Sequence, residues 1–183
     1  WMSWNLYAAL QQRQQKLVSK EKSANPLQFT GLLTLYYEGG NKMAEIPYSN
    51  GVQNGTIQTF FEGSGNLNEK IEIRNDQRNG QYQEYDKNGQ LLVNATYKDN
   101  MLNGAKTYFY ANGKPMLNLT YYKGVLNGEA TSFDEQGNKL ISMKFANNLP
   151  DGAQTAYYPN GKVKFSKNYK GAILTSMLEN NGR

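Results

Sequence analysis

The segment from Gly104 to Gly128 reads GAKTYFYANGKPMLNLTYYKGVLNG, and related segments precede and follow it. Each begins with a glycine, and successive glycines are 24, 25, 24, 24 and 24 residues apart. These glycines are Gly31, Gly55, Gly80, Gly104, Gly128 and Gly152. Self-similarity at such a period is the signature of a repeat architecture. The sequence therefore predicts six tandem units, counted here from the N-terminus.

Every unit carries two turn signals. The leading glycine follows Asn in four units, and Asp151 precedes Gly152 in the sixth. A second glycine comes about half a period later, at Gly40, Gly65, Gly89, Gly113, Gly137 and Gly161. Asn-Gly pairs adopt positive φ at little cost, as tight hairpin turns require. We therefore predict two short strands per unit, with the Asn-Gly pairs at the turns.

The second strand of each unit alternates between apolar and polar residues. In the fourth unit Leu117, Leu119 and Tyr121 lie on one face, and Asn118 lies on the other. Such alternation is typical of a half-exposed antiparallel strand. Only 38% of residues are hydrophobic, which suits a shallow sheet. We predict an all-β fold: an elongated single twisted antiparallel sheet of about six tandem β-hairpin repeats, or about 12 strands, with aromatic ladders along it.

The N-terminal part differs from the repeats. We divide the chain into a helical segment or linker at residues 1–28 and a repeat domain at residues 29–183. Within the first, residues 4–22 read as a helix that either caps the first hairpin or pairs with a partner helix. Trp1, Trp4 and Tyr7 are typical of a membrane–water boundary. We therefore expect a signal or membrane anchor to precede Trp1; alternatively, these aromatics pack on the first unit.

The composition excludes several kinds of chemistry. There is no Cys and no His, which removes disulfides, Cys/His metal sites and Ser-His-Asp catalysis. The pairs Glu84 with Asp86 and Asp134 with Glu135 are interpreted as surface charge. The net charge of +5 is concentrated at the two ends rather than along the body, which disfavours nucleic acid. We predict no enzyme activity, cofactor, metal or nucleic-acid partner.

Aromatic doublets near the second turn suggest a binding surface. Because neighbours on a strand point to opposite faces, one aromatic of each pair is predicted to be core and the other exposed. The exposed line comprises Tyr37, Phe61, Tyr110 and Tyr158, interrupted by Asp86 and Asp134. Such residues suit sugar rings or a protein partner; alternatively, they cover the second face of the sheet.

A basic end of the chain is the other candidate surface. Lys162 and Lys164 are predicted to share a face, and Lys167 to point to the opposite one. Anionic lipid or an acidic partner would bind there. Alternatively, these lysines protect a terminal strand from edge-to-edge aggregation.

The units resemble a known repeat. The run Tyr157-Tyr158-Pro159-Asn160-Gly161-Lys162 and the fourth unit are similar to the bacterial variant of the MORN repeat, and the resemblance covers about residues 31–171. It implies a β-hairpin array. Proteins of this type are scaffolds, linkers and membrane-associated modules, and some of the bacterial ones are labelled antitoxins.

These observations favour a non-enzymatic repeat scaffold that mediates protein–protein interaction at the bacterial cell envelope, either periplasmic or membrane-anchored. A cytoplasmic location is left open. One alternative is an antitoxin or immunity-like protein that neutralises a toxin. The other is a glycan- or lipid-binding module. Membrane association would come through the segment preceding Trp1.

Overall fold

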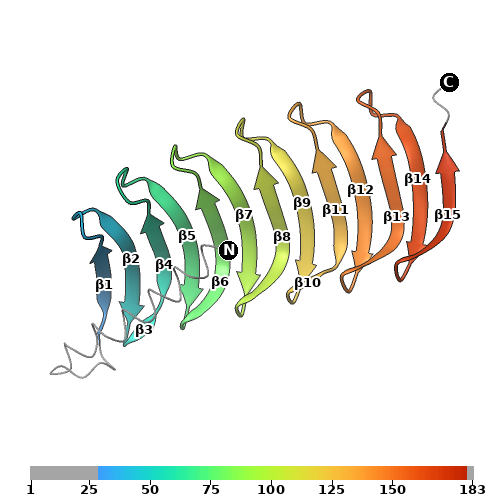
Figure 1. Ribbon diagram of the computed structural model, residues 1–183. Helices are drawn as coiled ribbons and strands as arrows, with labels where there is room; N and C mark the ends of the chain where they lie inside the picture. Colours follow the sequence, from blue (N-terminus) through green and yellow to red (C-terminus); the bar gives the residue numbers. More distant parts are fainter. Residues whose placement is uncertain (1–28, 181–183) are drawn as a thin grey trace.

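The computed structural model describes residues 29–180, which form one open antiparallel sheet of 15 strands. Strands follow one another across the sheet in chain order, so the array is a continuous meander (Figure 1). The first strands are β1 (Gly31–Tyr36), β2 (Lys42–Ser49), β3 (Val52–Gln53), β4 (Gly55–Phe60), β5 (Leu67–Arg74), β6 (Gln77–Tyr85), β7 (Leu91–Lys98) and β8 (Met101–Phe109). The remaining strands are β9 (Pro115–Tyr122), β10 (Val125–Leu126), β11 (Gly128–Phe133), β12 (Lys139–Ala146), β13 (Leu149–Tyr157), β14 (Val163–Lys170) and β15 (Ile173–Glu179).

The predicted all-β array is confirmed, with two main strands in each unit. The short strands β3 and β10 pair with β2 and β9 and are separated from β4 and β11 by one residue each. The predicted helix at residues 4–22 lies outside the described residues. In the described part of the chain, no helix is long and apolar enough to cross a membrane.

Two kinds of connection alternate along the sheet. One edge carries two-residue turns with positive φ at both residues, as in Asn75-Asp76 (49° and 61°) and Asn147-Asn148 (52° and 67°). The other edge carries loops of five residues, or six in the second unit, in which the second glycine of the unit closes the turn. In the fourth unit, for example, the amide of Gly113 donates to Tyr110 O at 2.9 Å. The second glycines are therefore turn glycines, as predicted.

The predicted position of the leading Asn-Gly pairs is wrong, whereas Asn88-Gly89, Asn112-Gly113 and Asn160-Gly161 lie in loops, as predicted. The tight turns lie four residues earlier, and Asn79-Gly80 sits inside β6, where three residues oppose the single Glu72 of β5. The glycine has a φ of 130° and lies under the Glu72 side chain, which accepts a hydrogen bond from the amide of Gln81 at 3.0 Å. A preference for positive φ serves a bulge as well as a turn, so the pair alone did not distinguish them.

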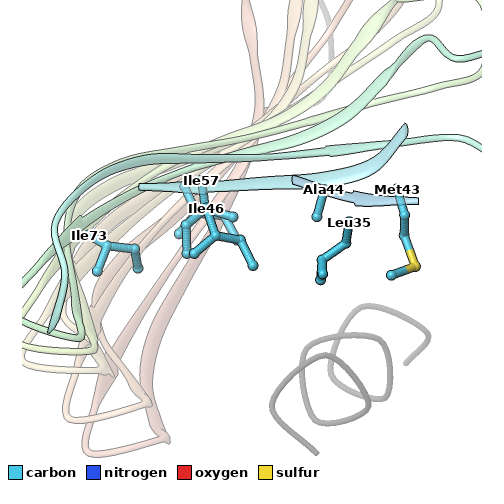
Figure 2. Close-up of a cluster of buried hydrophobic side chains, with 7 residues drawn as sticks. Leu35, Met43, Ala44, Ile46, Ile57 and Ile73 are labelled. Atoms are coloured by element: carbon cyan, nitrogen blue, oxygen red, sulfur yellow. The ribbon is translucent and has the colours of Figure 1, made fainter. Parts of the chain in front are cut away.

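A second bulge lies near the five-residue loops. Leu35 pairs with Ala44 and Tyr36 with Lys42, so Met43 is an extra residue. Figure 2 shows Met43 on the same side of the sheet as Leu35 and Ala44, inside the bend of the strands. The equivalent extra residues in the other units are Asn68, Leu92, Met116, Leu140 and Lys164. Because bulges bend a strand, two per hairpin give the sheet a concave face, named here the inner face.

The core lies on the inner face of the first three units. Its buried cluster comprises Leu35, Met43, Ala44, Ile46, Ile57, Ile71 and Ile73 (Figure 2). Val93 and Ala95 of β7 are also buried. Burial then declines along the array. Leu35 is 6% exposed, whereas its counterpart four units away on the same face, Ser132, is half-buried and pairs with Ile141, which is 39% exposed. The repeated backbone therefore carries an unevenly buried face.

Candidate protein-interaction surface

Across the middle of its strands, the outer face of the sheet is polar from β7 to β14. Directly paired residues form a row of hydroxyl and amide side chains across the middle of the strands. From β7 to β14 the row reads Asn94, Thr107, Asn118, Thr131, Ser142, Thr155 and Ser166. Polar side chains of this kind keep a sheet face compatible with water, so the middle of the outer face offers little apolar area for a partner. Exposed apolar residues of this face, such as Tyr36 and Met101, lie nearer its two edges.

The inner face of the fourth to sixth units is apolar and accessible. We call it the open inner face and define it by Met116, Leu117, Leu140, Ile141, Met143 and Phe165. Met116 is 37% exposed and Leu140 42%, whereas the equivalent Met43 of the first unit is only 6% exposed. Adjoining exposed apolar residues on one face are typical of an interaction site.

Lysines flank this apolar surface. Lys106 lies in β8 with its Nζ 4.8 Å from the ring centroid of Tyr108, and Lys167 lies in β14 with its Nζ 5.1 Å from that of Phe165. Lys164 approaches the Tyr158 ring at 5.9 Å. Among the described residues, none of these three ammonium groups forms an ion pair. The open inner face is therefore apolar with basic flanks.

The predicted separation of Lys164 from Lys167 is wrong. Strict alternation places residues three apart on opposite faces, but the pairing of Ala156 with Phe165 and of Tyr157 with Val163 makes Lys164 an extra residue. By its equivalence to Met43, Lys164 joins Lys167 on the inner face. Lys162 lies in the exposed loop before β14, outside the strand.

The assignment of the aromatic doublets is reversed in the first unit. Tyr36, predicted to be core, is 57% exposed, whereas Tyr37 packs against the buried cluster. The Tyr37 hydroxyl donates to Phe60 O at 2.9 Å, and burial raises the pKa of that hydroxyl. Tyr37 therefore links neighbouring units as well as packing against the core.

The other predicted aromatics occupy the same loop position. Phe61, Tyr110 and Tyr158 are half-buried rather than exposed, and Tyr110 donates to Phe133 O at 2.7 Å. Their contact with a partner stays a prediction. The structure brings Tyr158 and Lys164 together, but it spreads the set as a whole along one edge of the sheet.

In the third and fifth units, Asp86 and Asp134 occupy the loop position that an aromatic residue fills in the other units. Each accepts hydrogen bonds from backbone amides of its own loop. The Asp134 carboxylate accepts hydrogen bonds from the amides of Gln136 and Asn138 and from the Asn138 side chain. The Asn138 side chain is the main cause that lowers the pKa of Asp134. Asp86 makes equivalent bonds to the amides of Asn88 and Gln90. These carboxylates therefore hold their own loops.

One acidic cluster lies on the inner face, and the sequence reasoning missed it. Glu69 of β5 pairs directly with Glu84 of β6, and the Tyr82 hydroxyl lies 2.8 Å from Glu69 Oε1 and 3.1 Å from Glu84 Oε2. Burial raises the pKa of Glu69, and burial is also the main cause that raises the pKa of Tyr82. Only the register between strands could have revealed this contact.

The described residues hold no group of three or more acidic side chains placed to bind a metal. The Glu69–Tyr82–Glu84 cluster brings only two carboxylates together. Asp86 caps a loop and does not join Glu84 in a site. The geometry that stands out in residues 29–180 is thus a surface: an open array whose outer face has a polar middle row and whose inner face is apolar and partly exposed.

The fold and this surface define a class of protein, the open β-hairpin repeat array. The family model described as MORN repeat variant matches the chain at three places, residues 29–50, 78–99 and 150–170. These matches fall on the first, third and sixth units, so these three units are similar to the MORN repeat variant. Repeats of this type are found in scaffold and binding modules.

Two solved structures are similar to part of the chain. A variant of S. aureus TarM, solved with fondaparinux, α-GlcNAc-glycerol and UDP, is 12% identical over 74% of this chain and 23% of its own, with a TM-score of 0.38. A second TarM structure is 13% identical over 78% of this chain and 27% of its own, with a TM-score of 0.36. The chain spans about a quarter of their length, and such TM-scores support neither a fold nor a function. No curated protein matches the sequence.

Proposed function

We propose that this protein is a non-enzymatic repeat scaffold that binds a protein partner through the open inner face. The observation that carries the proposal is the exposure of Met116, Leu140 and Ile141 on a face whose equivalents in the first unit, Met43 and Ala44, are buried. Burying apolar area is worth roughly 25 cal/mol per Å², so such a face gains from being covered. The lack of His and Cys supports the non-enzymatic part.

The partner is expected at the bacterial cell envelope. Support for this part comes from Trp1, Trp4 and Tyr7, whose residue types are enriched at membrane–water boundaries. Fractionation of native cells tests it independently of binding: we expect the protein with the envelope fraction, and recovery wholly in the cytoplasm would contradict this part alone.

Site-specific crosslinking tests the binding surface. A photo-crosslinking amino acid placed at Met116 or Leu140 is expected to yield the same protein adduct in native cells. Placed at Glu129 or Lys139, which are exposed on the outer face, it is expected to yield much less. Equal adducts from both faces, or none above background, would contradict the proposal.

A further inference from the structure

The open inner face has the shape of a trough. Because the bulges bend each strand along its own length, the hollow they create runs across the strands and along the array. Neighbouring strands are about 4.8 Å apart, so the five steps from β8 to β14 span about 24 Å. A straight rod fits a trough of this shape, whereas a flat membrane surface would meet only its rims.

Large and small side chains alternate along the floor of the trough. Successive direct pairs join Leu117 to Ser132, Ser132 to Ile141, Ile141 to Ala156 and Ala156 to Phe165. Ser132, which is half-buried, and Ala156, which is only 6% exposed, are therefore the small positions of this row, and we call them notches. They lie two strands apart, or about 9.5 Å. Side chains seven residues apart on an α-helix are separated by about 10.5 Å. Successive heptad positions of one helix thus match the two notches.

The flanks of the trough are basic. Lys106 and Lys167 lie in the row of residues nearer the tight turns, and Lys164 lies nearer the five-residue loops. Glu179 is the carboxylate that shares this face in the last strand, opposite Phe165. Helices with acidic residues on both sides of an apolar stripe complement such a surface, whereas helices with basic flanks are repelled.

From this geometry we propose that the open inner face binds one α-helix of a partner protein, about 16 residues long, which lies along the array. Its apolar side chains repeat every seven residues and pack over Ser132 and Ala156, between their larger neighbours Leu117, Ile141 and Phe165. Its Asp and Glu residues meet Lys106, Lys164 and Lys167. This inference rests on the proposed function and adds the form and charge of the partner segment.

The test uses the full chain and fluorescent peptides. One peptide has leucines in a heptad pattern with Glu on both flanks, a second has Lys in place of Glu, and a third is a scrambled form of the first. We expect the Glu peptide alone to bind, as measured by fluorescence anisotropy. The double variant Lys106→Glu, Lys167→Glu is expected to bind the Glu peptide about tenfold or more weakly, since like charges then face the Glu flanks. It is expected to bind the Lys peptide instead.

The Lys peptide also serves as the folding control, because an unfolded double variant would bind neither peptide. Lys139→Glu, on the outer face, is expected to leave binding unchanged. Filling a notch with Ser132→Phe is expected to weaken binding of the Glu peptide. An unchanged circular dichroism spectrum would show that this variant is still folded. Equal binding of the scrambled or Lys peptide, or unchanged preference in the double variant, would overturn the inference.

Other occupants give different results. Binding to anionic vesicles without binding to the Glu peptide would identify a lipid site, and a dimer in light scattering that Ile141→Lys separates would identify a second copy. Either result overturns the helix inference. If crosslinking from Met116 succeeds but no peptide binds, the proposed function stands and the helix inference fails. If both fail, both are wrong.

Discussion

Individual residues at the tight-turn edge connect one unit to the next. The amide of Asn100 donates to Arg78 O at 3.0 Å, and its side-chain Oδ1 accepts from the amide of Arg78 at 2.8 Å. Asp76 makes the same reciprocal pair with Gln53, and Asn148 with Leu126. Asn and Asp suit this position for two reasons. They tolerate positive φ, and their side-chain oxygen accepts the hydrogen bond from the amide of the neighbouring unit.

Gly124 occupies the same position without a side chain, and we predict that Gly124→Asn stabilises the protein. Its φ of 81° is left-handed, and its amide already donates to Leu102 O at 2.7 Å. The added carboxamide would accept from the amide of Leu102, a bond worth about 1 kcal/mol. For a chain of this size we expect a melting temperature about 2–4 °C higher. Gly124→Ala is the control: it adds a Cβ at positive φ without a hydrogen-bond acceptor, so it should lower the melting temperature.

Gly80 is predicted to be intolerant of a side chain. At a φ of 130°, a Cβ would lie 2.9 Å from the Glu72 Cβ. Strain at such φ costs on the order of 1–3 kcal/mol, before the clash is counted. Gly80→Ala should therefore lower the urea midpoint clearly. Gly39→Ala, where a Cβ meets nothing within 4 Å, should change it little, and similar shifts in the two variants would contradict the bulge assignment.

Pairs of strands determine which side chains meet. Glu69 and Glu84 come together because β5 and β6 pair in one register. Since burial raises the pKa of Glu69, its folded form holds a proton more tightly than its unfolded form. The contribution of this group to stability is therefore present at acidic pH and is lost as the pH rises through the folded pKa.

We accordingly predict that Glu69→Gln stabilises the protein at pH 7 and has a smaller effect near pH 4. Gln keeps an acceptor for the Tyr82 hydroxyl and removes a buried charge beside Glu84. Melting temperatures of the two proteins between pH 4 and 7 measure the difference, expected to be a few degrees at pH 7. Glu38→Gln, in an exposed loop, is the matched control. A difference in melting temperature that does not change with pH would argue against a buried charge on Glu69 as the cause.

The whole molecule is a one-dimensional array with uneven packing. Each strand pairs only with its neighbours in the sheet, so stability is expected to be a sum of unit and neighbour contributions. Buried apolar side chains concentrate from β1 to β7, whereas every residue of β15 is exposed. The C-terminal units therefore have less packing to hold their hydrogen bonds closed.

Hydrogen exchange is predicted to follow this gradient. Amides of β5 and β7, both interior strands, should exchange more slowly than those of β12 and β14, which are also hydrogen-bonded on both sides. Because opening free energies track local burial, we expect rates to differ by at least about tenfold. Mass spectrometry of exchanged peptides measures this. Equal protection across all four strands would mean that the sheet opens as one cooperative unit.

The repeat period, the two strands per unit and the apolar alternation of β9 were predictable from local order alone, because glycine spacing and side-chain period are properties of the chain itself. Three features depended on tertiary structure: the placement of Asn79-Gly80 in a bulge, the shared face of Lys164 and Lys167, and the contact of Glu69 with Glu84. Each depends on the register between strands. One extra residue in a strand reverses the face of everything beyond it, and only the paired strand shows where that residue lies.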